Sequence, residues 1–453
     1  MSNSTIRLGT ASPGTQATTA ATIEQVSQIA QRAASQGIDI LLLPEAYIGG
    51  YPRGTSFGCI IGERKQEGRE EYARYFDSAV DLGDTVGENG AGGGDRWVKR
   101  QIGGGAPRGD GSREKLEKIA KDSGVFLVLG CIEKAGGTLY CAAVYICPEE
   151  GMIGKRRKVM PTGSERLCWG QGSPSTLKAV STTIRGVRIN LAAAICWENY
   201  MPLLRQTLYA QNINLYLAPT ADNRDAWLSL MRTVGIEGRC FVVSSNMCVP
   251  KAAAPAAGAG SSSAGTRSRR RNSTITAEGN EIALPGPSAA QAKSRSRRKS
   301  VFDEDGNEIV LCRGQEPKVN GEAVGDQVAS SDPPPAQAKS RSRRKSVFDE
   351  DGNEIVLCRG QEPKVHGEAV GEPVASTGPP AGFESRGGSS IVSPMGDVLA
   401  GPQWEDNEGL IYADVDFRDC IKGRLDFDAA GSYSRNDSFN FSVNGLDLDP
   451  LSY

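Results

Sequence analysis

A long polar stretch divides this chain and restricts its core to what the two flanking parts can build. Residues 251–380 open with KAAAPAAGAGSSSAGTRSRRRNS and show almost no apolar periodicity. A segment of this composition buries too little apolar surface to offset the entropy of ordering its backbone. We therefore expect one domain built from residues 1–250 and 381–445, a low-complexity and disordered insert at 251–380, and a tail at 446–453.

The insert contains an internal duplication. QAKSRSRRKSVFDEDGNEIVLCRGQEPKV begins at Gln291 and again at Gln337, and a diverged third copy, RRNSTITAEGNEIAL, lies upstream. A repeat of this length is compatible with a solenoid. Because each copy is too polar to bury a face, the sequence instead favours a short hairpin around DEDGNEIVL in each copy of a disordered insert.

The flanking parts have the periodicity of an α/β domain. A strand at 5–11, an apolar-striped helix at 21–37 and a buried strand at 38–45 give a strand–helix–strand opening. The pattern predicts further helices and strands, and the last two strands lie in IVSPMGDVLAGP and EGLIYADVDF. These are helices at 113–121 and 201–211, and strands at 125–132, 138–147, 186–196, 213–218, 240–246, 391–402 and 408–417.

Composition and charge narrow the class of protein. The net charge of −2 gives no general attraction to nucleic acid, and no run of about 18 apolar residues could span a membrane. The N-terminal stretch lacks the apolar segment of a signal peptide. Eleven cysteines without a CxxC pair, with one histidine, give no support for a zinc site. We expect a soluble cytoplasmic protein with reduced thiols and without metal or cofactor.

A charged or reactive residue ends two of the predicted strands. Cys196 ends the run NLAAAIC, and Glu45 ends IDILLLPE. The one histidine, His366, lies in the insert where the other copy has Asn320, so a cysteine–histidine pair is excluded. The remaining general bases are Glu, Asp, Lys and Tyr. A basic segment, GKRRKVMPTGSER at 154–166, could supply a lysine beside the cysteine.

These residue types would form a coherent cysteine hydrolase. Glu45 would take the thiol proton, the thiolate of Cys196 would attack an electrophilic carbon, and a lysine would stabilise the developing negative charge. Each residue also has a purely structural interpretation. Cys196 could be a core thiol, Glu45 a solvated turn residue, and Lys155 and Lys158 part of a solvated basic face. Spacing alone leaves both interpretations open.

Three sequence motifs, in this order, favour the catalytic interpretation over the structural one: LLLPEAYIGGYPRG, RRKVMPTGSERLCWGQG and AAAICWENYMPLLR. They resemble the nitrilase family and its nitrile-hydrolysing branch, and the match extends to APTADNRDAW, EGRCFVVSSNMCV, SRGGSSIVSP and GSYSRNDSF. The resemblance implies a four-layer α-β-β-α sandwich and a homo-oligomer that ranges from a dimer to a spiral. Many members carry histidine where this chain has Ser432, so no role of that histidine is transferred.

The resemblance also implies residue roles. Glu45 in LPE would be the general base, and Cys196 in CWE the nucleophile. Lys158, directly before VMPT, would stabilise charge, and Glu165 would help to position Lys158 and the substrate. Trp197 would border the substrate pocket.

The implied reaction is hydrolysis of a nitrile by water to the carboxylic acid and ammonia, through a thioimidate and an acyl-enzyme. CWENYMPLLR and APTADNRDAW resemble aromatic nitrilases and arylacetonitrilases most. Two alternatives release an amide: a cyanide hydratase and a nitrilase/hydratase of the β-cyanoalanine type.

A non-enzymatic alternative rests on the insert. RRxS motifs at 270–273, 297–300 and 343–346 resemble sites of basophilic kinases, so phosphorylation could make the insert an interaction module. Its arginines could also bind nucleic acid. The net charge and the lack of interleaved aromatic residues argue against that reading.

Overall fold

A computed structural model of the chain describes residues 5–87, 90, 92, 94–251 and 382–453. It also describes the backbone of six three-residue strands between residues 273 and 356. The described residues fall into two units. The first unit holds the two parts that flank the insert, and the second holds the short strands.

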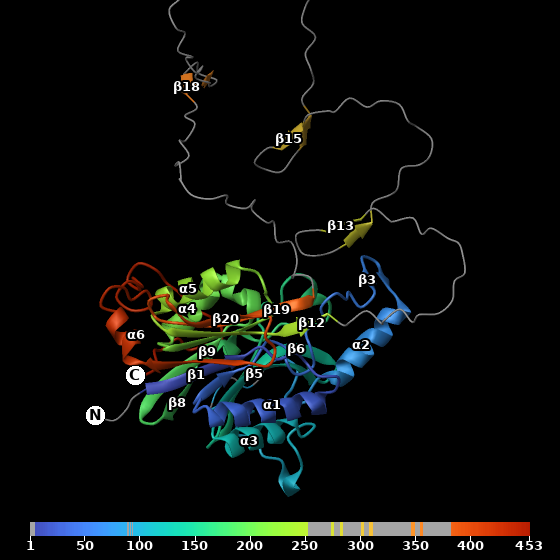
Figure 1. Cartoon of the computed structure of the whole chain (residues 1–453), viewed down its shortest axis with the longest axis vertical. Coiled ribbons are helices and arrows are strands. Elements are labelled where there is room, and N and C mark those ends of the chain that lie inside the picture. Colours follow the sequence, from blue (N-terminus) through green and yellow to red (C-terminus); the bar gives the residue numbers. More distant parts are fainter. Residues whose placement is uncertain are drawn as a thin grey trace, which may run out of the picture. The chain divides into compact units, whose positions relative to one another are not determined.

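The first unit contains a six-stranded sheet that begins with the predicted strand–helix–strand opening. β1, β2 and β5 run parallel to one another, whereas β6, β7 and β21 pair antiparallel with their neighbours. Two helices, α1 (Thr19–Ser35) and α3 (Ser112–Ser123), cover its outer face (Figure 1). In spatial order the strands are β21 (Leu410–Asp416), β1 (Thr5–Ala11), β2 (Ile40–Leu42), β5 (Phe126–Ala135), β6 (Thr138–Cys147) and β7 (Gly151–Arg157).

A second sheet completes the first unit. Its central strands β9, β10 and β11 are parallel, and β19, from beyond the insert, pairs antiparallel with β11. Two helices, α4 (Pro202–Ala210) and α5 (Ala226–Gly238), cover its outer face. One side of β19 (Phe383–Val392) pairs with β20 (Val398–Trp404). The other side pairs with β11 (Phe241–Asn246) and, farther along the same register, with β12 (Cys248–Pro250). Beyond β11 follow β10 (Leu215–Thr220), β9 (Val187–Ala193) and β8 (Val180–Ile184).

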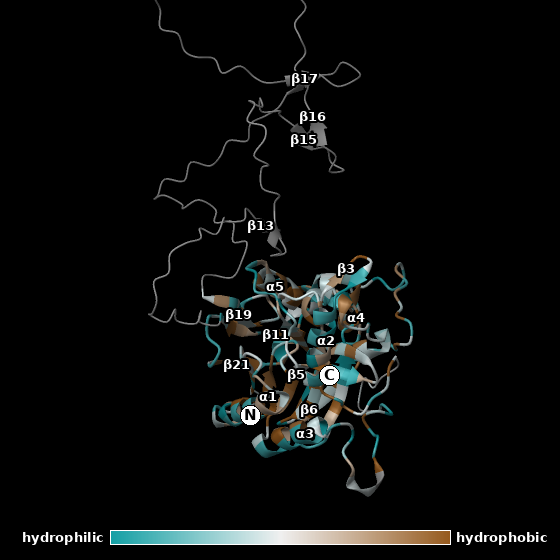
Figure 2. Cartoon of the chain, turned by 90° about the vertical axis from the view of Figure 1, so that its right-hand side faces the viewer, coloured by the Kyte–Doolittle hydropathy of each residue, from teal (hydrophilic) through white to brown (hydrophobic). Residues whose placement is uncertain are grey.

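Three apolar clusters separate four layers of structure. In β5, Phe126 and Val128 belong to the cluster between the sheets, whereas Leu127 and Leu129 pack under α1 and α3. This alternation follows from the two-residue repeat of a strand. A third cluster lies between the second sheet and its helices. Figure 2 shows hydrophobic colour on the strands inside the fold and hydrophilic colour on exposed sides of the helices. The predicted α-β-β-α sandwich is confirmed.

Several elements were not predicted. β7 contains the basic run KRR, and α2 (Gln66–Ser78) has a polar sequence in which only Gly68 is buried, so neither carries a clear apolar period. The helix α5 was also missed. The remaining short elements are β3 (Cys59–Ile60), β4 (Glu63–Arg64), α6 (Arg418–Gly423) and the 3-10 turns η1 (Gly103–Gly105), η2 (Gly163–Leu167), η3 (Pro174–Leu177) and η4 (Cys196–Tyr200).

In the second unit, each copy of the repeat forms a two-stranded hairpin, as the sequence predicted. The serine of each RRxS motif is the first residue of its hairpin, while the arginines lie outside the described residues. Apart from Lys251, the rest of the insert also lies outside them, so its predicted disorder stays a prediction. The hairpins pair β13 (Ser273–Ile275) with β14 (Glu281–Ala283), β15 (Ser300–Phe302) with β16 (Glu308–Val310), and β17 (Ser346–Phe348) with β18 (Glu354–Val356).

The two ends of the insert meet at one place in the second sheet. β12 and β19 form an antiparallel pair in which Pro250 lies opposite Phe383. Just beyond this pair, the backbone N–H of Lys251 donates to the carbonyl of Gly382 at 2.8 Å. The chain therefore leaves the sandwich and returns to it at adjacent positions.

The predicted tail packs against the sandwich. Asn212 donates to the carbonyl of Leu451 at 2.7 Å, and Asn190 donates to the carbonyl of Ser452 at 2.8 Å. Leu451 also packs on the cluster beneath α4 and α5. In the described part of the chain, every helix is too short or too polar to cross a membrane.

Candidate active site

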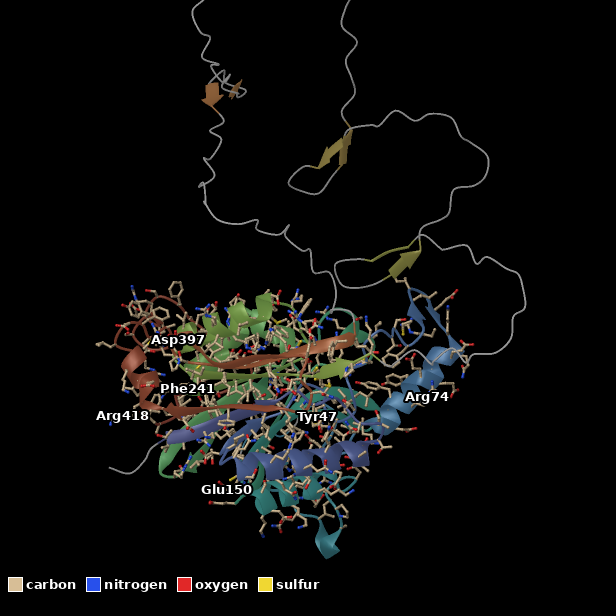
Figure 3. All side chains as sticks on the ribbon, viewed as in Figure 1. Tyr47, Arg74, Glu150, Phe241, Asp397 and Arg418 are labelled. Carbon is tan, nitrogen blue, oxygen red and sulfur yellow. The ribbon has the colours of Figure 1, made fainter. Side chains whose placement is uncertain are left out.

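Three of the predicted site residues follow strand ends from both sheets. Glu45 comes shortly after β2, Lys158 directly after β7, and Cys196 shortly after β9. Glu45 and Lys158 have no exposed surface, and Cys196 is 4% exposed. The alternative of a solvated turn residue at Glu45 is therefore wrong. Figure 3 shows Tyr47, two residues after Glu45, within the fold, whereas Arg74, Glu150 and Arg418 lie at its edges.

The ammonium group of Lys158 lies between two carboxylates. Its Nζ donates to Glu45 Oε1 at 2.8 Å and to both oxygens of Glu165, at 2.9 and 2.8 Å. Burial alone would lower the pKa of Lys158, but the negative charges around it, Glu45 first among them, raise that pKa well above its usual value. Lys158 is therefore a permanent cation at neutral pH.

Glu165 is itself held in place by neighbouring donors. Thr162 starts the turn η2, and its backbone N–H donates to Glu165 Oε2 at 2.7 Å. The hydroxyl of Tyr51 donates to Glu165 Oε1 at 2.9 Å. Tyr51 was not predicted as a site residue from the sequence, although it lies in GGYPRG, the end of the first matched motif. Together these donors fix Glu165, which in turn fixes Lys158.

The two oxygens of Glu45 have different surroundings. Oε1 accepts from Lys158, whereas Oε2 is buried without a hydrogen-bond partner among the described residues. Burial raises the pKa of Glu45 above its usual value, and the charge of Lys158 only partly opposes this effect. A buried carboxylate with a raised pKa and an unoccupied oxygen is suited to accept a proton.

Cys196 is the first residue of η4, at the turn that follows β9. Its φ of +54° is in the left-handed region, which residues other than glycine rarely occupy. Strained positions of this kind are concentrated at functional sites. Thr220, the last residue of β10, donates its hydroxyl to Cys196 Sγ at 3.3 Å.

The charges around Cys196 dictate how its thiolate can form. Burial and the charge of Glu45 raise the pKa of the thiol, so loss of its proton to solvent is unfavourable. Transfer of that proton to Glu45 leaves the total charge of the buried cluster unchanged, and Lys158 stays available to balance the thiolate. The arrangement therefore permits a nucleophile that is activated only by its own buried base.

Glu198 connects the lysine and cysteine segments and was missed in the sequence analysis. This fully buried carboxylate accepts through Oε1 from the backbone N–H of Val159, at 2.7 Å, and through Oε2 from that of Ile195, at 2.8 Å. Arg156 Nη2 also donates to Oε1, at 2.6 Å. One carboxylate thus fixes the residue after Lys158 and the residue before Cys196. Glu198 is the last residue of the motif CWE, and this position is the sequence feature that could have identified it.

We expect Glu198→Gln to lower kcat by roughly 100-fold with little change in KM, because a shift of about 1 Å between reacting groups has that effect. The amide offers one acceptor oxygen, so either the Ile195 or the Val159 N–H loses its partner. Steady-state kinetics measures the change. Glu117→Gln is the matched control, since Glu117 also pairs with a buried arginine, Arg113, but lies on α3. An unchanged kcat for Glu198→Gln would contradict the assignment.

Lys155 belongs to a different buried cluster. Its Nζ lies 2.7 Å from Asp84 and also contacts Glu133, which in turn pairs with Arg157. The four residues from Lys155 to Lys158 are at most 1% exposed, so the alternative of a solvated basic face is wrong. The structure therefore groups Lys158, and not Lys155, with Glu45 and Glu165.

Aromatic rings lie around the charged cluster. Tyr51 and Trp169 pack edge to face at 5.6 Å, and Lys158 Nζ lies 5.4 Å from the Trp169 ring. Trp197 is 39% exposed, and its indole N–H donates to Asp222 at 2.9 Å. The pocket role of Trp197 stays a prediction.

Ser432, the position at which many members of the family carry histidine, is exposed. Over the described ranges, no group of three or more His, Cys, Asp or Glu side chains is placed to hold a metal ion.

Comparison with known proteins gives consistent matches. Residues 5–280 match the family model described as carbon-nitrogen hydrolase. The chain is 32% identical over 421 residues to a nitrilase of Bradyrhizobium diazoefficiens, covering 93% of this chain and 86% of the relative. It is 31% identical over 432 residues to an aliphatic nitrilase of Sinorhizobium fredii, with coverages of 95% and 92%. It is 30% identical over 428 residues to an arylacetonitrilase of Trametes versicolor, with coverages of 93% and 90%.

Proposed function

This chain belongs to the nitrilase family of carbon-nitrogen hydrolases and is a hydrolase acting on nitriles, and from this premise we propose how it acts. Cys196 forms a covalent bond to the nitrile carbon, and the products are the carboxylic acid and ammonia. The observation that carries this proposal is the Lys158 ammonium, hydrogen-bonded to Glu45 and Glu165 in one buried cluster with Cys196. Its substrates are aromatic nitriles and arylacetonitriles.

In the first step, Glu45 accepts the thiol proton of Cys196. The sulfur forms a bond to the nitrile carbon, one π bond of the C≡N group breaks, and its electron pair moves to nitrogen. Lys158 stabilises the negative charge that develops on this nitrogen. The proton held by Glu45 then passes to the nitrogen, which gives a thioimidate and restores the carboxylate.

In the second step, Glu45 deprotonates a water molecule that adds to the thioimidate carbon. Protonation of nitrogen and cleavage of the C–N bond release ammonia and leave a thioester. A second water then cleaves the C–S bond, which releases the acid and returns the thiol. If the first tetrahedral species loses sulfur instead of nitrogen, the product is the amide.

The aromatic preference is supported by two observations. The Trp169 ring lies 5.4 Å from Lys158 Nζ and packs edge to face on Tyr51, and Trp197 follows Cys196 directly, so an aryl group bound there would pack against aromatic rings. One relative of similar identity is named an arylacetonitrilase, although another is named an aliphatic nitrilase.

Ammonia release from phenylacetonitrile, benzonitrile, butyronitrile and cyanide tests the proposed substrates, with acid and amide separated by chromatography. The expected result is the highest kcat/KM for an aryl substrate, with the acid as main product. A preference for butyronitrile or cyanide, or a main product that is the amide, would contradict the proposal. Assembly into homo-oligomers and a cytoplasmic location stay predictions.

We expect the acid limb of the pH profile to lie above the usual range of a glutamate. Glu45 must be ionised to act as a base, and its pKa is raised from 4.5 mainly by burial. kcat/KM should therefore fall as the pH drops through this raised pKa. Lys158 keeps its charge throughout, since its pKa is raised above 10.5. Kinetics between pH 4 and pH 9, with circular dichroism as a control for unfolding, measures the limb. An apparent pKa at or below 4.5 would contradict this role of Glu45.

A further inference from the structure

A second thiol contacts the catalytic carboxylate. Cys141 lies on β6, fully buried on the face that points between the sheets, and its Sγ donates to Glu45 Oε1 at 3.6 Å. Its backbone carbonyl accepts from the backbone N–H of Lys158 at 2.7 Å. One residue of β6 therefore contacts both the proposed base and the proposed charge-stabilising lysine.

Cys141 is a permanent hydrogen-bond donor at this position. Burial, reinforced by the charge of Glu45, raises the pKa of the Cys141 thiol well above its usual value. The thiol therefore stays protonated at neutral pH and does not compete with Cys196 as a nucleophile. A thiol is a weak donor, so its contribution is to orientation more than to charge.

The consequence for Glu45 is an asymmetric carboxylate. Oε1 receives two donors, Lys158 Nζ at 2.8 Å and Cys141 Sγ at 3.6 Å. Oε2 receives none among the described residues. Two donors on one oxygen resist rotation of the carboxylate about its terminal bond, which is otherwise soft. The unoccupied oxygen is then held in one direction.

We propose that Cys141 is a positioning residue that holds Glu45 Oε1, so that Oε2 is the atom that exchanges protons with Cys196 and with water. This inference rests on the proposed function of Glu45 as the base. It predicts that loss of the S–H donor lowers kcat while substrate binding is retained, because Cys141 acts through Glu45 and not on the substrate. It also predicts that a hydroxyl donor at the same position restores the rate.

The test compares Cys141→Val, which removes the donor and replaces the sulfur by two methyl groups, with Cys141→Ser, which keeps a donor. The expected result for Cys141→Val is a kcat lower by about tenfold, the effect of one hydrogen bond on a barrier. KM should stay within about twofold. The acid limb of kcat/KM should move to higher pH, because a carboxylate that loses a donor becomes easier to protonate. Cys141→Ser should recover most of kcat.

Cys147→Val and Cys147→Ser are matched controls, because Cys147 is a buried thiol on the same face of the same strand. Both should have the kcat and pH profile of the unmodified chain. If Cys141→Val does not fold, Cys141→Ala replaces it in the same comparison. A Cys141→Val or Cys141→Ala variant with unchanged kcat and pH profile, or a Cys141→Ser variant as impaired as either, would overturn the inference.

The kinetic comparison uses whichever nitrile the full chain hydrolyses, so failure of the aromatic preference does not affect it. A second readout needs no turnover: the rate at which iodoacetamide alkylates Cys196, followed by peptide mass spectrometry against pH. Removal of the Cys141 donor should shift that pH dependence, and the Cys147 variants should not. If no nitrile is hydrolysed, the proposed function fails, whereas an alkylation profile that is unchanged in Cys141→Val contradicts the positioning role alone.

Discussion

Replacement of Cys196 by alanine is expected to lower nitrile hydrolysis by roughly 10⁴-fold or more, because no covalent intermediate can form. The fold should persist. The change removes one sulfur atom that accepts from the hydroxyl of Thr220, and alanine is strained no more than cysteine at a φ of +54°. Ammonia release and thermal unfolding measure the two effects on the same preparation.

The control for this variant is a second buried thiol outside the charged cluster. Cys240 is fully buried in the apolar layer beneath α4 and α5. Cys240→Ala should lose some stability, as any core truncation does, and should keep its rate per folded molecule. Retention of ammonia release by Cys196→Ala would remove Cys196 as the nucleophile.

The second large effect is expected for Glu45→Gln and Lys158→Met, each of which should lose nearly as much activity as Cys196→Ala. Glutamine at 45 cannot accept the thiol proton. Methionine at 158 leaves Glu45 and Glu165 buried without a cation, so protonation of these carboxylates becomes favourable and the base is lost together with the charge. The double variant should be no worse than either single variant, since groups that act as a unit are not additive.

Lys155→Met is the matched control for Lys158→Met. Lys155 is equally buried and also contacts two acidic residues, Asp84 and Glu133. This variant should unfold at a lower temperature and yet hydrolyse nitriles at nearly full rate per folded molecule. A severe kinetic defect at Lys155 with a mild one at Lys158 would reverse the assignment of the two lysines.

The fold was predictable from sequence where apolar residues follow a clear period. The strand predicted at 138–147 is β6 with identical bounds, and the helix predicted at 21–37 is α1 shifted by two residues. The prediction of one strand over 391–402 was wrong. This segment is the end of β19, a turn, and the start of β20. β19 begins with the polar sequence FESRGGSS, which is a strand because it pairs with β11 and β12 along one side and with β20 along the other.

The buried basic run shows why the site was only partly predictable. Four consecutive cations, Lys155 to Lys158, are characteristic of a solvated surface when the chain is considered locally. They are buried because acidic partners surround them. Most come from distant segments: Glu133 and Asp84 for two of the cations, Glu198 for Arg156, and Glu45 for Lys158, while Glu165 follows Lys158 by seven residues. Burial of a charge depends on such partners, and sequence spacing does not give their distances.

The residues that support the site were missed for the same reason. Cys141 and Thr220 are ordinary members of apolar strands in the sequence, and Tyr51 is one aromatic residue in a turn. Each contacts the candidate site because a strand or turn from elsewhere in the chain places it within hydrogen-bond distance of Glu45, Cys196 or Glu165. The matched motifs predict which groups react, and that role stays a prediction, whereas the groups that surround them could be found only in the structure.

The adjacent ends of the insert, joined by the Lys251–Gly382 hydrogen bond, have a consequence for how this protein folds during synthesis. About 130 residues separate β12 from β19, and closing a loop of that length costs roughly 2 kcal/mol more than closing a loop of ten residues. At typical translation rates the ribosome needs on the order of ten seconds to synthesise them. During that interval β1 lacks β21 and β11 lacks β19. Both sheets then have an unpaired edge strand, which can pair with another chain, so the insert length sets how long those edges stay exposed during synthesis.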